Sequence, residues 1–416
     1  MRYYAIQITD GQGNIYLPNV GGNPGFSLVP FQAGLCTYSS LLPGATVSQI
    51  GGANRAALLF ECDIGVTFGH APGLVMPWVK IHGIGLAEVG QAANLNGAFI
   101  TVYGGMSAGL PLANYPDQSG PLFTGQIWQC FGNWVGTDMS LSIYIAVTSS
   151  PSSNQTTAHP VTSSTLPGPN MSIPGFYDAP ANLVFAWYAG QPLLQALVQC
   201  LKVAYPQLSI LGAVSSNLVW SGAPSVGYFQ TFKQLAYHIN TATLNLLQGY
   251  APPIYVSSNP QYPGVQICIN SNGEIVITDT TTQTTPKQIL VQNMIGQPSW
   301  SKPGMVQVIT QMRADLSAGD YVVLPDVPGI TTAGSNSQTF EPAQYANNPY
   351  SKLKNSSIFQ GTFQVNYVRH VGNSRQPDGT SWCTTFDIMP IMKPVSVVDQ
   401  YPVLSKGDPK YGFNVS

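Results

Sequence analysis

The stretch GTFQVNYVRHVGNSRQPDGTSWCTTFDIMPI, from Gly361 to Ile391, carries a clear fold signal and gathers several charged residues around its middle. In its first and last parts, apolar, aromatic or β-branched side chains recur at every second position. They are Phe363, Val365 and Tyr367 before the middle, and Trp382, Thr384, Phe386 and Ile388 after it. Because a period of two is typical of half-buried strands, we predict a β-hairpin with a polar tip.

The tip of this hairpin is the candidate site for function. Pro377 to Gly379 form a turn signature, because proline fixes φ and glycine accepts positive φ. Arg375 and Asp378 lie close enough in sequence to pair and hold the loop, which stabilises by at most about 1 kcal/mol when exposed. An ordered polar loop suits contact with a partner, and a catalytic role stays open as the alternative. The partner-contact candidates are Arg369, His370, Arg375 and Asp378.

Charge is scarce over the whole chain. Of 416 residues, 8% are charged and 44% are hydrophobic, whereas about 25% of an average soluble domain is charged. The formal net charge of −2 supplies no field to hold nucleic acid, so we expect no sequence-specific nucleic-acid binding. A net charge near zero also favours association. We interpret the composition as that of an assembly component; a compositional habit of the source is the alternative.

Neither membrane insertion nor a disulfide framework is predicted. No apolar run approaches the roughly 18 residues of a membrane helix, and the start MRYYAIQITDGQGN becomes polar too early for a signal-peptide core. The six cysteines form no C-x-x-C pair and have no histidine at zinc spacing. We expect reduced, buried thiols. The cysteines are Cys36, Cys62, Cys130, Cys200, Cys268 and Cys383.

Composition and period divide the chain into five segments. We predict a mainly β fold with a smaller α/β insert and two β-barrel-like domains in one chain. The predicted segments are a first β-barrel domain at 1–148, a Ser/Thr/Pro-rich linker or long loop at 149–174, a mixed domain with two helices at 175–260, a second β-barrel domain at 261–400 and a C-terminal tail at 401–416.

Local periodicity predicts the elements near the middle of the chain. QPLLQALVQCLKVAYP, at 191–206, places its apolar residues on one helical stripe. YFQTFKQLAYHINTATLNLL, at 228–247, predicts a second helix, and core packing is the expected role of both stripes. GVQICINSNGEIVITD, at 264–279, predicts a hairpin, because apolar residues alternate on both sides of a turn that tolerates positive φ.

No motif meets the requirements of a catalytic site. YGGMSAGLP contains the pattern G-x-S-x-G around Ser107, but a nucleophile elbow needs a following helix, and Pro111 and Pro116 predict a loop. HGIGLAEVG spaces its glycines wrongly for a dinucleotide loop. We therefore predict no enzymatic activity and no cofactor.

The histidines and glutamates are scattered along the chain. A metal site would have to be assembled from separate segments, so none is predicted. Paired-carboxylate glycosidase chemistry stays open, because such pairs meet in space. The histidines are His70, His82, His159, His238 and His370, and the glutamates are Glu61, Glu88, Glu274 and Glu341.

The order of motifs resembles that of the baseplate hub proteins of contractile phage tails. The resemblance rests on GQIWQCFGNWVGTDMSLSIYIAV, on QPLLQALVQCLKVAYP, and most on IGQPSWSKPGMVQVITQMRADLSAGDYVVLP followed by GTFQVNYVRHVGNSRQPDGTSWCTTF. It is a pattern over much of the chain rather than a diagnostic signature. The Ser/Pro-rich stretch near Ser150 and the tail beyond Pro402 have no counterpart in it.

This resemblance implies a homotrimer in which two similar β-barrel domains per chain alternate around a ring. Three chains would then offer a six-fold-like surface to the hexameric tail tube and a three-fold surface to the central spike. Implied partners are the tail tube protein, the central spike protein and the tape measure protein, and the implied location is the virion baseplate after assembly in the host cytoplasm. Such a hub has no catalytic residues and lines the DNA passage. Uncharged ring contacts would avoid desolvating buried ions, and a channel without basic patches would not retain DNA.

Two other classes of function stay open. One is a receptor- or carbohydrate-binding tail protein, and the other is a tail-tube or capsid subunit. The oligomer mass discriminates among them, because a trimer favours the hub, a hexamer the tube subunit, and a monomer with sugar affinity the binding protein. An enzyme ranks last.

Overall fold

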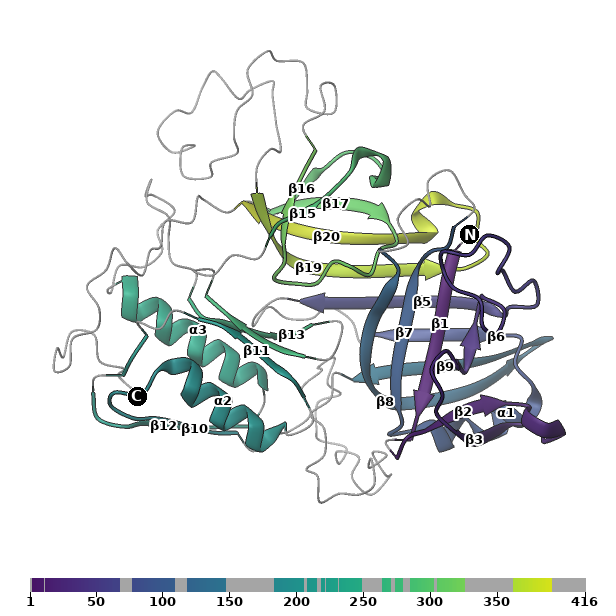
Figure 1. Cartoon of the computed structure of the whole chain (residues 1–416), viewed down its shortest axis with the longest axis horizontal. Helices are drawn as coiled ribbons and strands as arrows, with labels where there is room; N and C mark the ends of the chain where they lie inside the picture. The colour runs from purple at the N-terminus through teal and green to yellow at the C-terminus, as the bar shows by residue number, and fades with distance from the viewer. Residues whose placement is uncertain are drawn as a thin grey trace, which may run out of the picture.

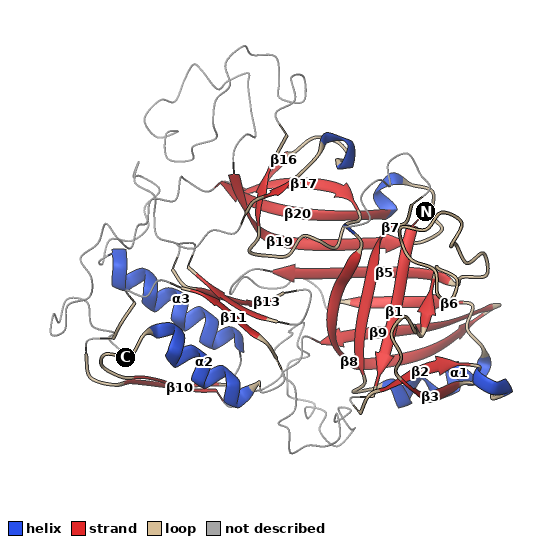
Figure 2. Cartoon of the chain, viewed as in Figure 1, coloured by secondary structure: helices blue, strands red, loops and turns tan. Residues whose placement is uncertain are grey.

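The fold is that of a computed structural model, which describes residues 2–10, 12–67, 77–108, 118–146, 183–205, 208–214, 218–220, 222–230, 232–248, 264–270, 274–279, 285–302, 305–325 and 362–390. Within these residues the chain is mainly β, with three α-helices and one small mixed sheet (Figures 1 and 2). The predicted linker at 149–174 and tail at 401–416 lie outside the described residues. None of the described helices has the length and hydropathy needed to cross a bilayer.

Most of the described strands come from the two ends of the chain. The N-terminal strands are β1 (Arg2–Thr9), β2 (Asn14–Pro18), β3 (Phe26–Pro30), β4 (Tyr38–Ser39), β5 (Leu59–Thr67), β6 (Trp78–His82), β7 (Phe99–Met106), β8 (Gly120–Val135) and β9 (Asp138–Ala146). The C-terminal strands are β15 (Lys287–Gln288), β16 (Ser299–Lys302), β17 (Met305–Gln311), β18 (Tyr321–Val323), β19 (Thr362–Asn373) and β20 (Trp382–Pro390). The helical elements among them are α1 (Leu86–Gln91), η1 (Val20–Gly22), η2 (Ala92–Leu95), η4 (Val291–Asn293) and η6 (Gly379–Ser381).

These fifteen strands form one continuous sheet that runs through both of the predicted β-barrel-like domains. The main path runs β16-β17-β20-β19-β5-β6-β9-β8-β7-β1-β2-β3, and β4, β15 and β18 attach beside it. The N-terminal and C-terminal halves join where β19 pairs with β5, antiparallel, from Tyr367 opposite Thr67 to Asn373 opposite Glu61. We call this β5–β19 pairing the seam. Each half therefore covers one edge of the other.

The described strands do not close into a barrel. In the N-terminal half, β8 pairs with β7 through its first part and with β9 through its second, with a register shift between Ile127 and Gln129. This irregularity lets one long strand turn a corner, so that β7 and β1 run across β5, β6 and β9 (Figure 1). At the open side, the ring of Tyr4 stacks on Phe60 at 4.7 Å in place of a ladder between β1 and β5.

Each half of the sheet has its own core. The N-terminal core gathers buried residues of β1 and β5 to β9, including Ile6 and Phe60, and it also takes in Met312, Ala314 and Trp382 from the C-terminal half. The C-terminal core gathers buried residues of β17 to β20, including Val308 and Phe386. The fold thus consists of two β halves that share one sheet edge to edge, and the C-terminal half adds a few side chains to the N-terminal core.

A smaller unit, the insert, lies between the two halves in sequence. Its elements are β10 (Leu183–Trp187), α2 (Leu193–Ala204), β11 (Ile210–Ala213), β12 (Ser225–Phe229), α3 (Phe232–Gln248), β13 (Gln266–Ile269) and β14 (Ile275–Thr278). Both predicted helices and the predicted β13–β14 hairpin are confirmed. The helices lie between the β10–β12 pair and the mixed β11-β14-β13 sheet (Figure 2). Because β14 pairs with β11, the hairpin belongs to the insert although it follows residue 260.

The hairpin predicted within 361–391 is confirmed as β19 and β20, with one correction to the faces of β19. Between Val365 and Tyr367 the register shifts by one residue, so the inward parity of β19 changes at this bulge. Beyond it, Val368 and His370 are buried, whereas Tyr367 is only partly buried. On β20 the predicted inward residues, from Trp382 to Ile388, are buried.

Candidate functional site

The tip of the β19–β20 hairpin is ordered and is held against the N-terminal strand. The guanidinium of Arg2, on β1, donates to the backbone carbonyls of Asn373 at 2.6 Å, Asp378 at 2.8 Å and Gln376. Nη2 of Arg375 donates to the carbonyl of Ala57 at 2.7 Å. The tip therefore rests on the N-terminal half of the fold and covers its open side.

Arg375 and Asp378 bind other groups instead of forming the predicted ion pair. Oδ1 of Asp378 accepts from the backbone N–H of Thr380 at 3.1 Å, and Oδ2 accepts from the Thr380 hydroxyl at 2.8 Å. These hydrogen bonds lower the pKa of Asp378. The two candidates remain exposed on the tip, which keeps them available to a partner.

Arg369 lies on the outer face of the sheet and fastens the seam. Its Nε and Nη2 donate to the two carboxylate oxygens of Asp63 at 2.7 and 2.6 Å, from β19 across to β5. This hydrogen-bonded pairing raises the pKa of Arg369. Because two parallel hydrogen bonds join the guanidinium to the carboxylate, this pair fixes the relative orientation of the two side chains as well as the distance between them.

A second chain of polar contacts crosses the same outer face. Nδ2 of Asn373 donates to Oε1 of Glu61 at 2.8 Å, across the seam. Oε2 of Glu61 lies 3.4 Å from Nε2 of His82, whose Nδ1 lies 2.8 Å from Oδ2 of Asp138. Together with the Arg369 pair, these polar contacts link β9, β6, β5 and β19.

His370 points to the opposite face and is 1% exposed. Its Nδ1 lies 2.9 Å from the hydroxyl oxygen of Thr384. Burial lowers the pKa of His370 to about 4, so the ring is neutral at pH 7. Its side chain does not reach the surface, because the bulge in β19 reverses the parity of the strand. His370 therefore leaves the set of partner-contact candidates.

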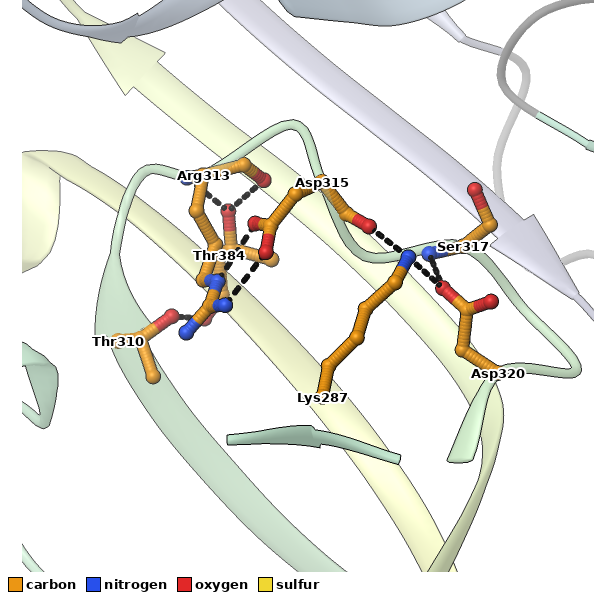
Figure 3. Close-up of polar contacts among 7 residues, drawn as sticks. All are labelled: Lys287, Thr310, Arg313, Asp315, Ser317, Asp320 and Thr384. Atoms are coloured by element: carbon orange, nitrogen blue, oxygen red, sulfur yellow. Dashed lines mark hydrogen bonds and ion pairs between the residues drawn. The ribbon is translucent and has the colours of Figure 1, made fainter. Parts of the chain in front are cut away.

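Besides its contact with His370, Thr384 takes part in a polar cluster that the sequence did not predict. Figure 3 shows this cluster around Thr384, Arg313 and Asp315. The Thr384 hydroxyl accepts from the backbone N–H of Arg313 at 3.0 Å and donates to the Arg313 carbonyl at 3.2 Å. The Arg313 side chain is buried, and its Nε and Nη2 donate to the two oxygens of Asp315 at 2.7 and 2.6 Å. The Thr384 hydroxyl thus lies within hydrogen-bond distance of His370 Nδ1 and of both backbone groups of Arg313.

A lysine completes this cluster on the other side of the loop (Figure 3). Nζ of Lys287 donates to Oδ2 of Asp320 at 2.7 Å and to the backbone carbonyl of Asp315. Oδ2 of Asp320 also accepts from the backbone N–H of Ser317 at 2.6 Å. The loop from Arg313 to Asp320, which we call the braced loop, is thus held at both ends by charged pairs.

The remaining chemical candidates show no assembled site in the described part of the chain. Ser107 is buried at the end of β7, and the loop expected after it lies outside the described residues. No group of three or more His, Cys, Asp or Glu side chains among the described residues is placed to hold a metal. All six cysteines are thiols, and only Cys36 is more than slightly exposed.

Comparisons with known proteins give no family for the chain. No family model and no curated protein matches it. Among solved structures, it is similar to a 43 kDa tail protein of prophage MuSo2 from Shewanella oneidensis, with a TM-score of 0.37, 10% identity, and 81% of this chain and 99% of that chain covered. It is also similar to a tail protein from Neisseria meningitidis MC58, with a TM-score of 0.38, 10% identity, and 96% and 99% covered. At TM-scores this low, neither similarity carries an argument about the chain.

Proposed function

We propose that the chain is a structural subunit of a phage tail, and that three copies form the baseplate hub between the hexameric tail tube and the central spike. The observation that supports the proposal is the seam. Two β halves, each with its own core, lie edge to edge in one chain. Three copies would therefore supply six β halves, which is the arrangement needed to match a six-fold partner on one side and a three-fold partner on the other.

The charge distribution supports the same role. On the outer face near the seam, Arg369 is matched by Asp63, and His82 lies between two carboxylates. A face of this kind offers no basic track to hold passing DNA. In the proposed hub, uncharged polar residues make the contacts between copies, which avoids burying unpaired ions.

In this proposal, strands β1 to β9 and β15 to β20 build the two barrel-like domains, within 1–148 and 261–400. The exposed tip, with Arg375 and Asp378, contacts a neighbouring copy or the tail tube protein. The central spike and tape measure proteins complete the partners, and the protein resides in the virion baseplate. It acts by fitting between neighbours of different symmetry and catalyses no reaction.

Native mass spectrometry of the purified chain tests the proposal. A species of three times the chain mass of 44.4 kDa is expected. A hexamer would favour a tube or capsid subunit instead. A monomer that binds sugars would favour a receptor-binding protein, and either result would overturn the hub.

A further inference from the structure

The insert is packed as an independent unit. Its core joins the inner faces of both its sheets to α2 and α3, with Phe185, Leu197 and Ile277 among the buried residues. None of the residues in this core belongs to the cores of the two β halves. The insert therefore has a core of its own.

The described contact between the insert and the β halves is small. Cys268 of β13 and Ala318 of the braced loop are buried against each other, with Val276 of β14 and Val66 of β5 packed around them. These side chains are short, so the apolar area that joins the two units is a small fraction of either core. We call this contact the joint.

A cavity of about 680 Å³ lies beside the joint. On the insert side it is lined by β11 and β14, and on the body side by Ser119 to Pro121 and by the braced loop. Leu211 lies directly opposite Val276 on the same sheet face, yet it is 48% exposed. The face of the insert sheet is thus packed at Cys268 and open at Leu211.

Each wall of the cavity is held together by contacts of its own. The insert wall is a sheet backed by its own helices, and the body wall is braced by the Arg313–Asp315 and Lys287–Asp320 pairs. Two rigid bodies that meet through a small apolar contact beside open space move relative to each other more easily than either deforms.

We propose that the insert is a hinged unit that rotates about the joint between Cys268 and Ala318. The cavity beside the joint provides the space for this rotation. Opening the joint moves Leu211 away from the braced loop, and closing it reduces the cavity. The motion belongs to the single chain, so it holds whether or not three copies assemble.

Distance measurements between spin labels test the hinge. Val203 on α2 and Ile50 in the N-terminal half are 81% and 79% exposed. Labels attached through an unnatural ketone amino acid at these two positions leave the native thiols untouched. In the full chain, we expect a distance distribution that is broad or has more than one maximum.

The substitution Ala318→Cys provides the lock, because Cys268 already lies against this position. Oxidation should join the two cysteines, as peptide mapping would verify, and should narrow the distribution to one maximum. Reduction should restore the width. In the control chain Cys268→Ala/Ala318→Cys, oxidation should leave the distribution unchanged, and a second label pair at Ile50 and Trp300 should stay narrow throughout.

The hinge is overturned if the unmodified chain already gives one narrow maximum that oxidation of the Ala318→Cys chain leaves in place. If the Ala318→Cys chain does not cross-link, the distribution of the unmodified chain still decides the question. The labelled chain is mixed with an excess of unlabelled chain, so that the label pairs report distances within one chain even in a trimer. This result is therefore separate from the oligomer mass that tests the hub.

Discussion

The ion pair across the seam gives the most direct test of how the two β halves are joined. Asp63 is 16% exposed and Arg369 is 43% exposed, and they share two hydrogen bonds. The substitution Arg369→Met keeps most of the aliphatic stem but leaves a largely buried carboxylate without its partner. We expect a loss of about 2 kcal/mol in the free energy of unfolding, a value discounted for the exposure of the arginine.

A double-mutant cycle separates the pair from the individual side chains. Asp63→Asn alone should cost about 1 kcal/mol, because the amide still accepts one hydrogen bond. The chain with both substitutions should lose less than the sum of the two, with a coupling of about 1 kcal/mol. Urea unfolding followed by far-ultraviolet circular dichroism measures all four chains.

Arg375→Met is the matched control, since the hydrogen bond that this substitution removes is the one from the exposed Arg375 side chain to the Ala57 carbonyl. It should cost about 0.5 kcal/mol or less. Two results would refute the reasoning that this pair fastens the seam. One is that the unfolding free energies lost by Arg369→Met and Asp63→Asn are strictly additive in the double variant, and the other is that Arg375→Met loses as much as Arg369→Met.

Three further predictions follow from the buried histidine, the tip and the insert. The pKa of His370 falls from 6.5 to about 4 on folding. The contribution of this histidine to stability is therefore fully present above pH 6.5, where the ring is neutral in both states, and is lost as the pH falls from 6.5 towards 4. His370→Gln should therefore flatten the pH dependence of the unfolding free energy by about 3 kcal/mol over that window, and parallel curves for the two chains would contradict this. Arg2→Ala should release the tip, so that amide hydrogen exchange at 374–380 becomes faster while exchange in β20 stays slow; unchanged exchange at the tip would show that Arg2 does not hold it. Leu197→Ala should destabilise the insert by about 2–5 kcal/mol and leave the thermal transition of the β halves in place, whereas a shift of both transitions together would show one cooperative core.

Elements set by local period could be predicted from the sequence, and pairings between distant segments could not. The stripe in α2 and the alternation in β13 and β14 each depend on a few consecutive residues, so they survive without knowledge of the fold. The seam joins Asp63 to Arg369, which lie 306 positions apart. Many strands in this chain carry the same alternation, and nothing in that pattern selects β5 as the neighbour of β19.

The candidate site was predicted in part for a similar reason. The turn signature at Pro377 to Gly379 is a local signal that marks the tip. Gly379, however, begins the 3-10 helix η6, which Asp378 caps, and does not take the positive φ that the signature predicts. His370 was misplaced because of the bulge in β19. A bulge adds one residue to the strand, so every side chain beyond it changes face, and the alternation of apolar and polar residues does not show where the bulge lies. The braced loop left a weak signal, since Arg313, Asp315 and Asp320 lie close together in a charge-poor sequence. Their pairing depends on Lys287 and Thr384, which come from elsewhere in the chain.

Electron cryomicroscopy of the purified oligomer tests the central claim most directly. The account predicts that three chains contribute a ring of six β halves around a passage, with the β5–β19 pairing inside each chain. One insert per chain should lie outside this ring, so that inserts recur once for every two β halves. A ring built from one β half per chain, or a particle in which the two halves of a chain occupy unrelated positions, would contradict it.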